Sequence, residues 1–173
     1  MIGGLVLLIA GGGSDSGSKA SPQVSNLQDR FLQHTVVNAE NGISVRRPGN
    51  WTDAKRNGVI TLQSHDRCLA MTLSAPVAAG QSKGLRSDSI ALLRRSDRDA
   101  KVGPAPNSQV GGIPTASNTV GFTDQKGNPI RVLLSVGTGT KNAYLTEVVV
   151  RDPTCQGDLN LGQIVLSSVQ YSK

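Results

Sequence analysis

Three apolar runs rich in β-branched residues follow one another in the second half of the chain. They extend over Ile113–Thr123, Pro129–Val136 and Ala143–Arg151. The breaks between them are rich in Gly, Asn and Asp, a composition typical of short hairpin connections. The runs therefore predict a three-stranded antiparallel meander over Ile113–Arg151, to which the rest of the fold attaches.

Alternation within the meander predicts which side chains share a face, because successive side chains of a strand point to opposite sides. The last two strands each have an apolar or Thr residue at every second position. The other positions are interrupted by Arg131, Ser135 and Glu147. The meander is thus expected to have one well-covered and one partly covered face. The positions predicted to be covered are Ile130, Val132, Leu134 and Val136, followed by Tyr144, Thr146, Val148 and Val150.

Shorter runs predict further strands before the meander. Ile43–Arg47 alternates like a strand, and Gly58–Ser64 with Cys68–Ser74 is typical of a hairpin. The segments between these elements and the meander contain several Gly and Pro residues. Pro76–Gly84 and Gly103–Gly112 are therefore predicted as loops.

Helical spacing of apolar residues predicts two helices. Ser87 or Asp88 can cap the first, which runs to about Arg95. Asp158 can cap the second, which runs to Val169. Helices packed on an antiparallel sheet form an α+β sandwich, which is the predicted fold class: an antiparallel sheet flanked by helices.

The N-terminal region predicts a leader and a linker. Residues 1–12 are apolar and uncharged, with the length of a signal-peptide core and too short to span a membrane, which takes about 20 residues. They are interpreted as a signal peptide or the remnant of a membrane anchor. Residues 13–41 are predicted as a flexible linker and 42–173 as the folded domain. Inside the linker, Leu27–Val37 is either a short amphipathic element or, at Gln33–Val37, a strand.

The charge pattern and the absence of catalytic motifs argue against several classes of function. The chain of 173 residues has a formal net charge of +6, but no run of five like charges and no aromatic residues between the basic ones. This pattern does not favour nucleic acid as a partner. His34 and His65 are the only histidines; Asp66 and Cys68 lie close to His65 in the sequence, but residues crowded on one turn rarely complete a metal site. No catalytic residue, metal ligand or cofactor is predicted.

Two short motifs resemble those of the PsbP-like family. They are the strand-Pro-Gly-Trp segment Val45–Trp51 and the Gly-hydrophobic-Pro step Val110–Thr115. Bacterial LpqN-type and DcrB-type secreted or lipid-anchored proteins belong to the same broad group. The resemblance implies an α-β-α sandwich without enzymatic activity, used as an accessory, binding or assembly module.

Together these observations predict a non-enzymatic, exported or membrane-tethered accessory or binding module of the bacterial cell envelope. The alternative is an extracytoplasmic regulatory or structural ectodomain of a membrane protein. The expected partner is an envelope protein or a small ligand, with the membrane close to the N-terminus. The sequence does not identify a binding residue.

The two cysteines predict a disulfide bond between Cys68 and Cys155, because an exported chain meets an oxidising compartment. Cys68 begins an early strand, and Cys155 follows the last strand of the meander. If the early hairpin lies beside that strand, the two Cα atoms can come within the roughly 4.4–6.8 Å that a bridge requires.

Overall fold

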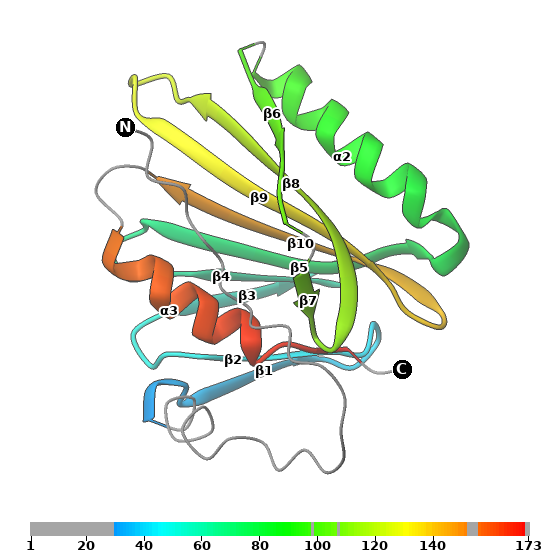
Figure 1. Ribbon diagram of the computed structural model, residues 1–173. Helices are drawn as coiled ribbons and strands as arrows, with labels where there is room; N and C mark the ends of the chain where they lie inside the picture. The colour runs from blue at the N-terminus through cyan, green and yellow to red at the C-terminus, as the bar shows by residue number, and fades with distance from the viewer. Residues whose placement is uncertain (1–29, 98, 107, 152–155, 172–173) are drawn as a thin grey trace, which may run out of the picture.

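The chain folds into two antiparallel β-sheets with helices packed on them (Figure 1). The structure is a computed structural model and describes residues 30–97, 99–106, 108–151 and 156–171, with the backbone alone for 156–160. The 8-stranded large sheet has the order β3-β4-β5-β10-β9-β8-β6, with β7 also paired to β8, and the 3-stranded small sheet has the order β1-β2-β11. The elements are β1 (His34–Asn38), β2 (Ile43–Arg47), β3 (Thr52–Arg56), β4 (Val59–Gln63), β5 (Leu69–Ala78), the 3₁₀ helix η1 (Ala79–Gln81), α2 (Ser82–Ser96), β6 (Lys101–Pro104), β7 (Ser108–Val110), β8 (Ile113–Thr123), β9 (Pro129–Thr138), β10 (Asn142–Arg151), α3 (Gln156–Ser167) and β11 (Gln170–Tyr171).

The large sheet is the central layer, and elements pack on both of its faces. α3 and the small sheet lie over one face, called here the inner face, and α2 lies over the other, the outer face (Figure 1). The main hydrophobic core fills the space over the inner face, and its fully buried side chains include Leu32, Ile60, Leu62, Met71, Leu73 and Val165. This arrangement confirms the predicted α+β class with an antiparallel sheet flanked by helices.

The predicted meander is confirmed, because β8, β9 and β10 are consecutive neighbours in the large sheet. The expectation that its apolar sets share one face is wrong. Tyr144 pairs with Gly137, so the set that begins at Tyr144 shares a face with the odd-numbered residues of β9. Tyr144 and Val148 belong to the main core, whereas Val132 and Leu134 are buried on the outer face. Both faces of the meander are therefore covered.

β5 continues to Ala78, although Pro76–Gly84 is predicted as a loop. A β-bulge explains the difference. The register of β5 against β10 shifts by one residue between Ser74 and Val77, so that two residues of β5 oppose one residue of β10. Pro76 is one of the two, and a proline, which has no N–H to donate, is tolerated at a bulge.

Both predicted helices are present with shifted bounds. α2 begins at Ser82, and Ser87, predicted as its cap, lies inside it and donates its hydroxyl to a backbone carbonyl one turn earlier. α3 ends at Ser167, so that Val169 lies between it and β11. Asp158 is the third residue of α3 and not the residue before it.

The edges of the large sheet were not predicted. β6 and β7 occupy half of the segment Gly103–Gly112, where a loop is predicted, and both pair with the same side of β8 as one interrupted edge strand. Pro104 and Pro106 lie at the interruption and remove N–H donors that could recruit another chain. The opposite edge strand, β3, is exposed throughout and carries charges that discourage pairing, at Asp53, Lys55 and Arg56.

The folded domain begins before residue 42, so the predicted linker 13–41 is too long. β1 pairs with β2 along its whole length, and Leu32 and Val36 are buried in the main core. The strand alternative for Gln33–Val37 is therefore confirmed. The predicted leader and the first part of the predicted linker lie outside the described residues. In the part of the chain that is described, no helix has the length and apolar character needed to cross a membrane.

β11 holds the C-terminal end of the described chain in the core. The ring of Tyr171 stacks on that of Tyr144, with 4.0 Å between the ring centroids. The hydroxyl oxygens of Tyr171 and Thr146 lie 2.7 Å apart and share a hydrogen bond. Burial raises the pKa of Tyr171 to about 12.

Tyr171 should make folding stability depend on pH at the alkaline end. Its pKa in the folded chain is above the ordinary 10.0 of the unfolded chain, so its contribution is complete below pH 10.0 and is lost as the pH rises to about 12. The expected loss is about 2–3 kcal/mol of unfolding free energy. Urea unfolding at a series of pH values should show this loss for the wild type and not for Tyr171→Phe. The prediction would be contradicted if the free energy of unfolding fell equally steeply with pH in the two proteins.

Candidate functional site

A row of three residues crosses β6, β8 and β9 at one end of the inner face. Lys101 pairs with Gly121, and Gly121 pairs with Arg131. Directly paired residues of antiparallel strands point to the same face, and Arg131 also pairs with Val150 of the main core. The row therefore lies on the inner face. Because neighbouring strands are about 4.8 Å apart, roughly 10 Å separates the backbones of Lys101 and Arg131, with a glycine between them.

The space over Gly121 is a hollow of about 580 Å³, called here the Gly121 hollow. A Cβ atom at this glycine would meet no heavy atom within 4 Å, so the missing side chain leaves open space. The lining combines charged, hydroxyl and apolar groups. It is formed by Asp99, Lys101, Gly121, Phe122, Thr123, Pro129, Ile130 and Arg131.

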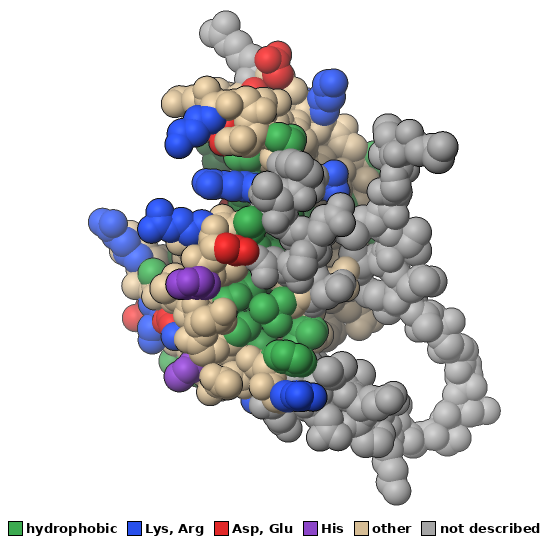
Figure 2. Space-filling view, turned by 90° about the vertical axis from the view of Figure 1, so that its left-hand side faces the viewer, with side chains coloured by type: hydrophobic (Ala, Val, Ile, Leu, Met, Phe, Trp, Pro, Cys, Tyr) green, Lys and Arg blue, Asp and Glu red, His purple; other side chains and the backbone are tan. Residues whose placement is uncertain are grey.

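The charge of the hollow comes from Lys101, Arg131 and Asp99. Asp124, in the nearby β8–β9 turn, is occupied by that turn, where it accepts hydrogen bonds from the side-chain amide and backbone N–H of Asn128. These bonds lower the pKa of Asp124 below its ordinary value. Figure 2 shows this end of the molecule, with Lys and Arg side chains gathered over its upper half.

A second hollow, of about 350 Å³, lies on the outer face beside the start of α2. It also has two cationic residues, Lys83 and Arg86, both on α2. These two cations come from the same helix, whereas those of the Gly121 hollow come from two different strands. The Gly121 hollow is the better candidate because the strand register fixes the places of its two cations.

The residues near His65 form a turn. Asp66 accepts a hydrogen bond from the hydroxyl of Ser64 at 2.6 Å and another from the backbone N–H of Cys68 at 3.0 Å. His34 lies on β1. Within residues 30–171 as described, no three His, Cys, Asp or Glu side chains are grouped as a metal site would need.

Three further side chains have structural roles. Arg94 and Arg95 lie exposed in the last turn of α2, where cations interact favourably with the helix dipole. Trp51 is buried in the main core.

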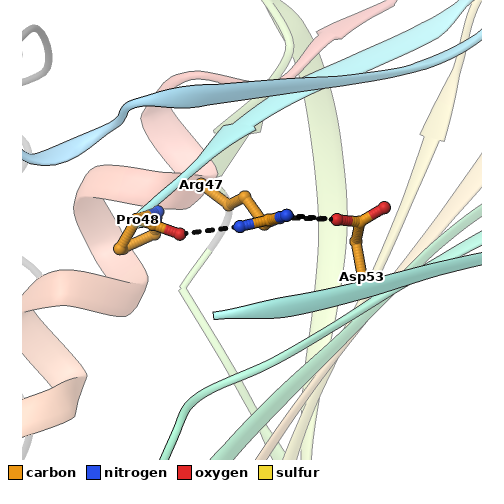
Figure 3. A network of polar contacts seen from close by, with 3 residues as sticks. All are labelled: Arg47, Pro48 and Asp53. Atoms are coloured by element: carbon orange, nitrogen blue, oxygen red, sulfur yellow. Dashed lines mark hydrogen bonds and ion pairs between the residues drawn. The ribbon is translucent and has the colours of Figure 1, made fainter. Parts of the chain in front are cut away.

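An ion pair fixes the turn that leads to Trp51 (Figure 3). Arg47 of β2 donates from Nε to Asp53 of β3 at 2.6 Å, and from Nη1 to the carbonyl oxygen of Pro48 at 3.0 Å. The Arg47 and Asp53 side chains are 15% and 27% exposed, so water shields the pair only in part. The network joins the small sheet to the edge of the large sheet and belongs to the scaffold.

The predicted disulfide is tested for one cysteine alone. Cys68 precedes β5, and its carbonyl oxygen accepts a hydrogen bond from the backbone N–H of Arg151 at 3.1 Å. The early hairpin thus lies beside the last strand of the meander, as the prediction requires. Cys155 lies outside the described residues, and the bridge stays a prediction.

Sequence reasoning missed the Gly121 hollow. Gly121 interrupts an apolar strand run, and such a glycine often marks a close approach or an open space. The sequence does not give the strand register, and only the register brings Lys101 and Arg131 to its two sides.

Comparison with known proteins finds similarity at the level of the fold. No family model and no curated protein matches the chain. The solution structure of cyanobacterial PsbP (CyanoP) from Synechocystis sp. PCC 6803 matches with a TM-score of 0.55 and 12% identity over 80% of this chain and 92% of that one. The Ran-binding protein Mog1p of Saccharomyces cerevisiae matches with a TM-score of 0.56 and 10% identity, covering 81% and 96% of the two chains.

A third match is a longer protein from Bacteroides thetaiotaomicron VPI-5482, with a TM-score of 0.55 and 18% identity. It covers 83% of this chain, which spans 50% of the Bacteroides chain. These matches define the chain as having a PsbP/Mog1-like α+β fold and so confirm the predicted PsbP-like architecture. At such identities they show the fold alone, and they do not test the predicted likeness to LpqN-type or secreted proteins.

Proposed function

We propose that this chain is a non-enzymatic binding module that is exported or tethered to the membrane as an accessory component of the bacterial cell envelope. The observation that carries the binding role is the Gly121 hollow, where Lys101 and Arg131 flank open space on a rigid sheet. No histidine or cysteine is among the described residues that line it, so its chemistry suits recognition of a charged group better than nucleophilic catalysis. The partner is an envelope protein or a small ligand, and not a nucleic acid.

Two features of the chain support export or membrane tethering. Residues 1–12 have the composition of a signal-peptide core or an anchor remnant. The position of Cys68 beside Arg151 favours a disulfide, and disulfides persist in oxidising compartments outside the cytoplasm.

An ectodomain of a membrane protein is the second candidate. It is favoured by the Bacteroides chain, of which this fold spans half, because a fold of this kind can then form part of a larger protein.

Fusion to a reporter tests the export proposal. Residues 1–41 placed before alkaline phosphatase, which is active only outside the cytoplasm, should give activity in bacterial cells. Leu7→Arg should lower this activity by about tenfold or more, because a charge in the apolar core opposes membrane insertion. A fusion that begins at residue 30 is the matched control and should be inactive. Equal, low activity of all three fusions would contradict the proposal.

A further inference from the structure

We propose that the Gly121 hollow binds a phosphate group, held between Lys101 and Arg131. This inference rests on the proposed binding function and specifies the chemical class of the ligand. Lys101 and Arg131 approach the space from two sides, and each can donate to oxygen atoms within it. A phosphate group presents at least three oxygens in a tetrahedral arrangement and can accept hydrogen bonds from both sides at once. A carboxylate has only two oxygens, both in one plane, and so accepts less fully from two cations on opposite sides.

The two cations supply different kinds of contact. The planar guanidinium of Arg131 presents five N–H donors in a fixed fork geometry. The ammonium of Lys101 acts as a point charge on a flexible stem. Both side chains are exposed, which allows them to reach over the glycine.

Gly121 gives the space that a phosphate needs. Its backbone φ is outside the left-handed region, so the local chain conformation does not require glycine. Glycine within a strand costs about 0.5–1 kcal/mol relative to alanine. The open volume above it is therefore the property that this position provides, and a methyl group would reduce that volume.

Asp99 limits what can bind. Among the described residues that line the hollow, two cations and one carboxylate give a net charge of one positive unit. This charge suits one phosphate group better than a polyanion, and it agrees with the exclusion of nucleic acid.

The test is a titration of the full chain with glycerol 3-phosphate, followed by the backbone amide signals in NMR spectra. The signals of Lys101, Gly121 and Arg131 should move together. Lys101→Met should weaken binding by about tenfold or more, which is typical for loss of a charged hydrogen-bond donor. Gly121→Ala should weaken binding by about fivefold or more through steric exclusion. The free energy of unfolding of this variant should be no lower than that of the wild type. Lys126→Met is the matched control, because it removes the same charge from the neighbouring turn, and it should change the affinity by less than about twofold.

A parallel titration with vesicles distinguishes a soluble phosphate ester from a lipid headgroup. Phosphatidylglycerol vesicles are compared with phosphatidylcholine vesicles, and the same three substitutions are applied. Binding of glycerol 3-phosphate or of phosphatidylglycerol that depends on Lys101 and Gly121 supports the proposal and assigns the source. Binding of neither, or equal losses with Lys101→Met and Lys126→Met, overturns it. The reporter fusions are independent of this result, so a failed phosphate site is distinguishable from a failed export proposal.

Discussion

Removing the predicted bridge between Cys68 and Cys155 should lower the free energy of unfolding by about 4–5 kcal/mol. The bridge closes a loop of about 87 residues, and in the chain-entropy model its main effect is to restrict the unfolded chain. Since a domain of this kind has a stability of about 5–15 kcal/mol, the reduced protein should lose a large share of its stability.

The strand register places Cys68 beside Arg151, the last described residue before Cys155 in the sequence. Val150 pairs with Leu69, and Arg151 donates to the carbonyl oxygen of Cys68. Cys155 follows Arg151 by four residues, and α3, which begins at the next residue, packs on β5. The end of the intervening segment at Arg151 is thus anchored beside Cys68, as a bridge of ordinary length needs.

Non-reducing mass spectrometry of the protein isolated from its native compartment should show one intramolecular bridge. Urea unfolding with and without reductant then measures its effect, and a Cys68→Ser, Cys155→Ser double variant serves as the control that should not respond to reductant. Two free thiols in the native protein, or the same midpoint with and without reductant, would contradict the prediction.

The sequence predicted those parts of the fold in which the alternation of apolar residues and the composition of the turns indicate the same structure. The three strands of the meander and the hairpin of β4 and β5 have alternating apolar residues and polar turns, and all were found. Elements without an apolar pattern were missed. β3 is exposed at each of its five residues, and β6 and β7 are short edge strands interrupted by prolines, so tertiary pairing alone makes them strands.

The pairing register between strands was the other feature that the sequence could not predict. The alternation of apolar residues is clear within β9 and within β10. The turn between the two strands decides whether Tyr144 faces the same side as Leu133 or as Leu134. The same limit applies to the Gly121 hollow, because three residues that are 10 or more positions apart in the sequence form it only through pairing across β6, β8 and β9.

The turn between β7 and β8 gives the second large effect on stability. Val110 pairs with Ile113, so Gly111 and Gly112 form a two-residue hairpin loop, with φ values of +61° and +74°. Positive φ at both central residues is typical of a type I′ turn, in which any residue other than glycine, asparagine or aspartate is strained.

The two glycines differ in their surroundings. A Cβ atom at Gly111 would lie 2.5 Å from Cδ2 of Tyr171, whereas one at Gly112 would meet nothing within 4 Å. The Tyr171 ring cannot move away easily, because it is buried and stacked on Tyr144. Gly111→Ala should therefore lower the free energy of unfolding by about 3–4 kcal/mol, through backbone strain and overpacking together.

Gly112→Ala is the matched control for Gly111→Ala, because it has the same backbone strain at positive φ but no contact with the Tyr171 ring. It should lower the free energy of unfolding by about 1 kcal/mol. Urea unfolding of both variants measures the difference. The collision is isolated by repeating the pair in a Tyr171→Ala background, where the ring is absent and the two alanine substitutions should cost nearly the same. If Gly111→Ala stays more costly than Gly112→Ala without the ring, contact with Tyr171 does not explain why glycine is needed at position 111.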